Sequence, residues 1–155
     1  PPVAGYLIRE LFYDRQPVLH STGEQRRDFV YVDDLIDLAI RVQNNQGYDC
    51  VNVSTNTTYS INELYKTIAK IMDKEHLQPV YVNSSNYWEK YPGLYEGAYP
   101  ISEQILDNEV NKYTLCDNTH AAEKFGWQPQ ISFEEGLRRT VDFSVDVLKK
   151  HDAAL

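Results

Sequence analysis

Long apolar runs and an excess of basic residues are both missing from this 155-residue sequence. A helix that crosses a bilayer needs about 20 consecutive apolar residues, and since no run of about 18 occurs we expect no membrane span. The first residues also lack a charged segment followed by an apolar signal core, which favours a cytoplasmic location. The formal net charge is −8. Because proteins that bind nucleic acids usually carry a basic face, this balance argues against a nucleic-acid partner.

Glycine-rich phosphate turns are missing as well. The seven glycines fall in neither a G-x-G-x-x-G nor a G-x-x-G-x-x-G arrangement, which is the spacing that lets a turn approach the pyrophosphate of a dinucleotide. None of the twelve tyrosines is followed by a lysine four positions later. Tyr87 and Lys90 are the nearest pair, and their spacing is one residue too short.

Cysteine and histidine are too few and too scattered to indicate a metal site. The two cysteines, Cys50 and Cys116, lie in apolar, strand-like surroundings without metal-ligand spacing. We expect them to be buried free thiols in a reducing compartment, and a disulfide remains an open alternative. The four histidines are His20, His76, His120 and His151.

The residues that are present predict a compact mixed α/β fold. The 42% hydrophobic content suits one domain over residues 1–155. Apolar periodicity and capping residues predict helices over residues 3–13, from Asp33 or Asp34 to about 43, from Ser60, over 118–125 and from Ser132. Alternating patterns predict extended segments or strands over residues 17–20, 29–32, 50–53, 79–82 and 110–115. Prolines and glycines predict a structured loop over residues 83–108.

The segment over residues 23–35 carries the most chemical information. It places a polar, cationic turn against a predicted strand and then begins a helix on two aspartates. A rigidly held guanidinium at Arg27 can form a two-pronged hydrogen bond to a phosphate. On spacing alone, a surface ion pair of Arg27 with Asp28 or another carboxylate is an equally open interpretation.

The segment reads G-x-x-x-R-D-F-V-x-V-x-D, and further pieces follow it in order: V-N-V-S at residues 51–54, S-x-x-E-L at 60–64, F-G-W-x-P at 125–129 and E-G-L-x-x-T at 135–140. This series resembles the C-terminal region of the extended short-chain dehydrogenase/reductase family, the NAD-dependent nucleotide-sugar epimerases and dehydratases. The resemblance implies the C-terminal portion of a Rossmann-type enzyme. Its glycine-rich turn and Tyr-x-x-x-Lys pair are not in this sequence, so we expect NAD to be bound by a missing N-terminal half.

The resemblance also implies a role for individual residues. The arginine of the R-D-F motif contacts the substrate diphosphate in the family, which implies that role for Arg27. Asn52 is a candidate for nucleotide contact, with backbone satisfaction at a strand end as the alternative. Leu19 and His20 are candidates for lining the nucleobase pocket, although His20 as an exposed turn residue remains open.

One departure from the family pattern puts the substrate in doubt. Many members carry an R-P-G-D element whose arginine makes a second phosphate contact, whereas residues 106–113 here hold no arginine and two acids. Lys112 is a candidate substitute, as a point charge without the planar fork. The second phosphate is otherwise held differently, or the ligand itself differs.

Two aromatic features have less direct interpretations. Trp127, between a glycine and a proline, is interpreted as core that locks a helix end, with ligand contact as the alternative. The tyrosines between residues 87 and 99 can form a substrate lid, a partner surface or simple loop packing.

Two functions from different classes follow. The leading one is the nucleotide-sugar-binding part of an NAD-dependent epimerase/dehydratase, inactive by itself and contributing no catalytic residue. The alternative is a non-catalytic ligand-binding or protein-interaction module that retains the fold. If an N-terminal half normally covers the strands over residues 29–32 and 50–53, the chain alone should self-associate through open edges and apolar surface.

Overall fold

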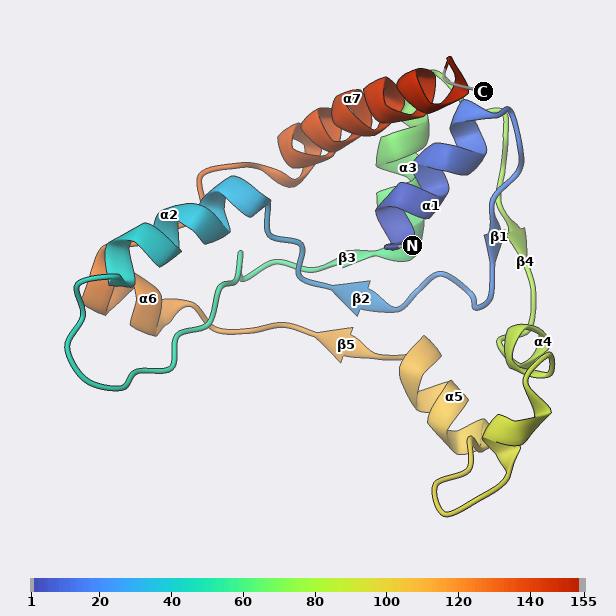
Figure 1. Cartoon of the computed structure of the whole chain (residues 1–155), viewed down its shortest axis with the longest axis horizontal. Coiled ribbons are helices and arrows are strands. Elements are labelled where there is room, and N and C mark those ends of the chain that lie inside the picture. The colour runs from blue at the N-terminus through green and yellow to red at the C-terminus, as the bar shows by residue number, and fades with distance from the viewer. Residues whose placement is uncertain (1, 154–155) are drawn as a thin grey trace.

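The computed structural model describes residues 2–153, in which helices surround several very short strands (Figure 1). This confirms the mixed α/β class. All five predicted helices are present. The described part of the chain holds α1 (Val3–Phe12), α2 (Val32–Val42), α3 (Ile61–Ile71), α4 (Ser85–Trp88), the 3₁₀ helix η1 (Pro92–Tyr95), α5 (Glu103–Val110), α6 (Thr119–Phe125) and α7 (Phe133–Asp152).

The main core lies between α1, α3 and α7, which pack against one another (Figure 1). Each of these helices contributes an apolar stripe at helical spacing, which is how an amphipathic helix buries one face. The fully or almost fully buried side chains include Leu7, Ile8 and Leu11 of α1, Leu64, Ile68 and Ala69 of α3, and Leu137 and Val141 of α7. This helical layer supports the strands beside it.

Serine residues begin two of these core helices as the sequence predicts. Ser60 Oγ accepts from the Glu63 backbone N–H at 3.1 Å, and the Ser60 backbone N–H donates to the Glu63 carboxylate at 2.7 Å. This reciprocal capping box satisfies two N–H groups at the start of α3. Ser132 caps α7 by accepting from the Glu135 backbone N–H. The reciprocal bond from the Ser132 N–H to the Glu135 carboxylate, which would complete a capping box, is not among the hydrogen bonds of the described residues.

The strands form two small sheets. In one, β1 (Val18–Leu19) pairs in parallel with β4 (Val80–Tyr81). In the other, β2 (Arg26–Arg27) pairs antiparallel with β3 (Tyr59–Ser60) and parallel with β5 (Tyr113–Thr114). The strand predictions for residues 17–20, 79–82 and 110–115 therefore find shorter counterparts.

Two predicted strands are wrong. Residues 29–31 follow β2 without helix or strand assignment and lead directly into α2, and residues 50–53 are also outside any strand. An extended segment becomes a strand only when a neighbour supplies its ladder of hydrogen bonds. Within residues 2–153 no such neighbour pairs with either segment.

A second, smaller core joins α2 to α6. Trp127 is completely buried there with Leu38 and Ala121, which confirms its interpretation as core. Its indole Nε1 donates to the Asp34 carbonyl at 3.0 Å. α6 ends at Gly126, whose φ of 61° is the left-handed conformation that glycine adopts most readily at a helix end.

The predicted aspartate cap of α2 is wrong. The helix begins one residue earlier than Asp33, with Tyr31 at the N-cap position and no side-chain cap. The Asp34 carboxylate is instead buried and accepts from the backbone N–H groups of Gln130 and Ile131 at 2.9 and 3.0 Å. Asp33 pairs with Arg139 of α7 at 3.2 Å. Both acids still lie in the first turn, where the helix dipole favours negative charge.

The segment over residues 83–112, which we call the arm, leaves the body of the fold between β4 and β5 (Figure 1). The prediction of a loop over 83–108 is wrong in part, because the arm contains α4, η1 and α5. Helix α5 begins just after Pro100, where Ser102 Oγ accepts from the Ile105 N–H at 3.3 Å. Prolines and glycines divide the arm into short pieces without preventing a two-turn helix.

The prediction that both cysteines are buried is also wrong. Cys50 and Cys116 are free and exposed. Both lie outside the helices and strands of residues 2–153. Within residues 2–153, no helix combines the length and the apolar character that a membrane crossing requires.

Candidate functional site

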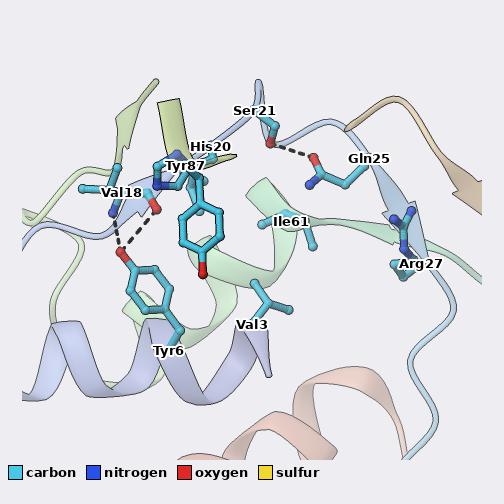
Figure 2. Close-up of a pocket in the computed structure, with 10 residues that line it drawn as sticks. Val3, Tyr6, Val18, His20, Ser21, Gln25, Arg27, Ile61 and Tyr87 are labelled. Atoms are coloured by element: carbon cyan, nitrogen blue, oxygen red, sulfur yellow. Dashed lines mark hydrogen bonds between the residues drawn. The ribbon is translucent and has the colours of Figure 1, made fainter. Parts of the chain in front are cut away.

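A cavity of about 540 Å³ opens between α1, the β1–β2 connection and the start of the arm (Figure 2). Its lining is apolar at one end and polar with one cation at the other. The residues that line it are Val3, Tyr6, Val18, Leu19, His20, Ser21, Gln25, Arg27, Ile61 and Tyr87. This volume falls in the range of small-molecule sites, which combine apolar walls with a few polar groups that orient the ligand.

The turn between β1 and β2 is fixed against the start of α3. Gly23 has a φ of 76°, and a Cβ there would lie 2.1 Å from Asn62 Oδ1, so no larger residue fits without displacing Asn62. The Asn62 backbone N–H donates to the Gly23 carbonyl at 3.0 Å, and its side-chain amide donates to the Thr22 carbonyl at 3.0 Å. The glycine of the motif therefore lets the turn close onto α3 and hold the cavity wall.

Tyr6 of α1 fixes the other wall. Its hydroxyl accepts from the Val18 backbone N–H at 2.8 Å and donates to the Val18 carbonyl at 3.2 Å (Figure 2). Between this point and Arg27, the Ser21 hydroxyl donates to the Gln25 side-chain oxygen at 2.9 Å. The Gln25 amide nitrogen has no protein acceptor within residues 2–153, so it remains available to a ligand.

Arg27 lies on β2 at the polar end of the cavity (Figure 2). Its Nη1 donates to the Lys112 carbonyl at 2.7 Å and to the Arg26 carbonyl at 3.0 Å. Its Nη2 donates to Glu109 Oε1 at 3.0 Å. The sequence left open an ion pair of Arg27 with Asp28 or another carboxylate, and the structure contains one with Glu109 while Arg27 also lines the cavity.

Asp28 is not the partner of Arg27, because its carboxylate is bound elsewhere. It accepts from the Thr55 backbone N–H at 3.0 Å, from the Thr55 hydroxyl at 2.7 Å and from the Ser54 hydroxyl at 2.5 Å. These bonds tie β2 to the segment that follows residues 50–53. Asp28 of the motif therefore has a structural role in this arrangement.

The neighbouring Arg26 points to a different set of partners. Its guanidinium donates to the Thr58 hydroxyl and carbonyl and pairs with Glu63 at 3.1 Å. The Ser60 backbone N–H, aided by the Arg26 charge, holds the pKa of the Glu63 carboxyl below its usual range. Arg26 does not line the cavity, which makes it a matched control for Arg27.

The apolar end of the cavity contains the two residues expected near the nucleobase. Leu19 is 5% exposed and lies on β1, and His20 follows it. The rings of His20 and Tyr87 meet edge to face with centroids 5.5 Å apart. His20 Nδ1 is buried without a hydrogen-bond partner in the described residues. Buried polar atoms in proteins normally have a hydrogen-bond partner, so this unpaired nitrogen is unusual.

The other two candidates lie outside the cavity lining. Asn52 is exposed, and its side-chain amide donates to the Asp117 carbonyl at 3.1 Å, an arrangement that matches the backbone-satisfying alternative. Lys112 is half exposed and its Nζ contacts Glu109 Oε2 at 3.2 Å. Its carbonyl, rather than its ammonium, contacts Arg27.

Sequence reasoning did not single out several lining residues. Ser21 and Gln25 belong to the same turn as Arg27, so their place in the motif was an available signal. Val3, Tyr6 and Ile61 lie on α1 and at the start of α3, and nothing in their local pattern separates a cavity wall from core. Tyr87 was one of several tyrosines with three open interpretations, and in the structure it lines the cavity and contacts the ring of His20.

The described residues do not contain the strand–turn–helix element that holds the pyrophosphate of a dinucleotide. A dinucleotide site needs a parallel strand, a glycine-rich turn and a helix N-terminus aimed at the pyrophosphate. Across residues 2–153, parallel pairing is limited to two-residue strands and no helix begins from a glycine-rich turn. The same residues contain no group of three His, Cys, Asp or Glu side chains arranged to hold a metal ion.

The fold and the motif series define the C-terminal part of an NAD-dependent epimerase/dehydratase. The family model described as GDP-mannose 4,6 dehydratase matches residues 8–140, which is most of the chain. The chain therefore belongs to the NAD-dependent epimerase/dehydratase family, the extended short-chain dehydrogenases/reductases, and corresponds to their C-terminal part.

Named relatives agree with this assignment. The UDP-glucuronate 4-epimerase of Thermodesulfobacterium geofontis is 25% identical over 146 residues, which cover 93% of this chain and 38% of the relative. The UDP-glucose 4-epimerase of Thermotoga maritima, solved with UDP-glucose, superimposes with a TM-score of 0.72 at 25% identity and covers 94% of this chain. The UDP-glucuronic acid 4-epimerase of Bacillus cereus, solved with NAD, has a TM-score of 0.69 at 19% identity and supports the fold alone.

The chain spans about two fifths of these proteins, at 38%, 40% and 39% of their lengths. The Thermotoga maritima relative was solved with UDP-glucose and the Bacillus cereus relative with NAD.

Proposed function

We propose that this chain is the nucleotide-sugar-binding part of an NAD-dependent epimerase/dehydratase that acts by transient hydride transfer. One observation supports the proposal above the others. The arginine of the R-D-F motif lines a cavity of about 540 Å³ whose opposite end is formed by Leu19, His20 and Tyr87. A cation at one end and apolar and aromatic groups at the other match the two ends of a nucleoside diphosphate.

The proposed contacts follow from this division of the cavity. Arg27 donates to the diphosphate through its planar guanidinium, a charge-assisted bond that is stronger than one between neutral groups. Leu19 contacts the base, and the ring of His20 stacks on it or pairs with its edge. Gln25, between the two ends, is placed to hydrogen-bond the ribose or phosphate.

This chain contributes binding and orientation, and none of its residues is given a part in the oxidation. Holding the nucleotide fixes the position of the attached sugar, and correct orientation can lower a reaction barrier by several kcal/mol. We propose that the N-terminal part of the family fold, which carries the glycine-rich turn and the Tyr-x-x-x-Lys pair, binds NAD and supplies the proton transfer. The chain by itself is then inactive.

The deciding experiment is a calorimetric titration of the 155-residue chain with UDP-glucose and dTDP-glucose. Arg27→Ala is expected to weaken binding by about 10- to 150-fold, because a hydrogen bond to a charged group contributes about 1.5–3 kcal/mol. Arg26→Ala is the matched control, since Arg26 lies next in the strand but contacts Thr58 and Glu63 instead of the cavity. Its affinity is expected to stay within about threefold of the parent.

Equal affinities of the parent and Arg27→Ala would remove Arg27 from the site. Absence of binding to either nucleotide sugar, both by the parent chain and by a variant that frees Arg27 from Glu109, would favour the second candidate, a non-catalytic interaction module. The specific observation behind that candidate is that Glu109 and two carbonyls already use the Arg27 guanidinium.

We further propose that the exposed apolar face of α2 normally contacts the N-terminal part. Val32, Leu35, Ile36 and Ile40 are each about half exposed, at 52%, 48%, 49% and 57%. Four neighbouring apolar side chains on one short helix are more than isolated surface residues account for. The adjacent residues 50–53 also lack a pairing strand in the described structure.

The chain alone is therefore expected to self-associate, with the sedimentation coefficient rising as the protein concentration rises. Ile36→Asp with Ile40→Asp is expected to return it to a monomer, because each charge would have to be desolvated in the contact. Phe143→Asp on α7, a residue that is 71% exposed, is the control and should not change the sedimentation. A parent chain that sediments as a monomer at every concentration would contradict this proposal.

A further inference from the structure

The two cations that are candidates for the ligand phosphates are bridged by one carboxylate. Glu109 Oε1 accepts from Arg27 Nη2 at 3.0 Å, and Glu109 Oε2 contacts Lys112 Nζ at 3.2 Å. A carboxylate uses its two oxygens in the same way that a phosphate uses two of its own. Glu109 does not line the cavity. It therefore binds the guanidinium of Arg27 without filling the space that a ligand would occupy.

Glu109 is held in this place by its cationic partners rather than by its own helix. It lies in the last turn of α5, which contains no basic residue. The helix dipole makes a negative charge unfavourable at this end, and the Glu109 side chain is 61% exposed to water. Within the described residues, the partners of its carboxylate are Arg27 and Lys112.

We propose that Glu109 is an intramolecular competitor of the ligand diphosphate for Arg27, so that nucleotide-sugar binding requires the end of the arm to release the guanidinium. This inference rests on the proposed function. It adds a residue that sets affinity and couples the site to the position of α5. Two effects oppose the ligand: the ion pair of Glu109 must break, and the carboxylate then repels the incoming phosphates.

The solvent exposure of the two side chains limits how strongly Glu109 can compete with the ligand. The Arg27 side chain is 26% exposed and that of Glu109 is 61% exposed, so water and salt screen the pair. The need to break the ion pair, together with the repulsion, is expected to weaken ligand binding by about five- to tenfold. The effect should shrink at high ionic strength, because both contributions are electrostatic.

The test is a double-mutant cycle of Arg27→Ala and Glu109→Gln, titrated with UDP-glucose. Glu109→Gln keeps the shape of the side chain and removes its charge, and it is expected to tighten binding by about five- to tenfold at about 0.05 M salt and by less than about twofold at about 0.5 M. In the Arg27→Ala background the same substitution is expected to give no more than a small gain from reduced repulsion. Glu103→Gln, at the other end of α5 and without an ion pair in the described part of the chain, should leave the affinity unchanged.

The outcomes separate the two proposals. If Arg27→Ala weakens binding while Glu109→Gln leaves it unchanged or weaker, the competitor role is overturned and the proposed function stands. If UDP-glucose binds neither the parent nor Glu109→Gln, the proposed function fails, and the competitor role fails with it. Binding by Glu109→Gln alone would support both. Circular dichroism of each variant, compared with the parent, verifies that a change in affinity does not come from unfolding.

Discussion

Trp127→Ala is expected to lower the free energy of unfolding by about 3–5 kcal/mol, the range found when a large aromatic side chain is removed from a core. Trp127 is completely buried in the small core that joins α2 to α6, where Leu38 and Ala121 are the other buried side chains among the described residues. A core this small has few side chains that can move in to fill the space. Since domains are stable by only about 5–15 kcal/mol, the loss is a large share of the total.

The measurement is a urea transition followed by circular dichroism. Trp88→Ala is the matched control, because Trp88 is the other tryptophan of the chain and is only partly buried in α4. Its cost is expected to be about 1 kcal/mol or less. Trp127→Phe keeps most of the ring volume but loses the bond from Nε1 to the Asp34 carbonyl, so it should fall between the two. A Trp127→Ala transition within about 0.5 kcal/mol of the parent would contradict the packing argument.

Asp34→Ala is expected to cost about 2–4 kcal/mol of unfolding free energy. The Asp34 side chain is almost completely buried, and its carboxylate accepts from the backbone N–H groups of Gln130 and Ile131 at 2.9 and 3.0 Å. Alanine leaves both donors without an acceptor, and each unsatisfied buried group costs about 1–3 kcal/mol. Some of this loss is recovered if water enters the space.

Asp33→Ala provides the comparison for Asp34→Ala in the same turn of α2. Asp33 forms an exposed ion pair with Arg139 at 3.2 Å, and such pairs contribute no more than about 1 kcal/mol. Asp34→Asn keeps one acceptor oxygen and should lie between Asp34→Ala and the parent. The midpoint of thermal unfolding for the three variants gives the order, and an equal loss for Asp33→Ala and Asp34→Ala would show that the buried bonds do not matter.

The contacts behind these two predictions link two of the motifs found in the sequence. Asp34 belongs to the G-x-x-x-R-D-F-V-x-V-x-D segment and Trp127 to the F-G-W-x-P segment, more than ninety residues further along the chain. The structure joins the two segments through the hydrogen bond from the Trp127 indole to the Asp34 carbonyl. The Asp34 carboxylate accepts from Gln130, the residue that follows the second segment. Within the first segment, Asp28 and Asp34 therefore stabilise the fold, and Arg27 is the charged side chain that reaches the cavity.

Local patterns were sufficient to predict most of the helices. The apolar spacing of residues 3–13 and the Ser60–Glu63 box specify α1 and α3, because a helix depends on residues that are close in sequence. Helix α5 was missed although Ser102 and Glu103 are a normal helix start. The prolines and glycines that precede Ser102 favoured a loop over the whole segment.

Local patterns were not sufficient for the strands. Residues 50–53 alternate as a strand would, yet they have no pairing partner in the described structure. Arg26 and Arg27 have no strand-like pattern, yet they form the central strand of a sheet because β3 and β5 flank them. The prediction that Cys50 and Cys116 are buried was wrong for a related reason, because burial depends on which distant parts of the chain pack over each cysteine.

The sequence by itself determined the family, most of the helices and the choice of Arg27 as the cation of interest, because each of these depends on residue types at short, fixed spacings. Only the tertiary structure decided which side chains share the cavity, and which carboxylate holds Arg27. It placed Leu19, His20 and Tyr87 around one space and brought Glu109 to the guanidinium from 82 residues away. Contacts between distant residues depend on how the elements pack, and no local pattern encodes that packing.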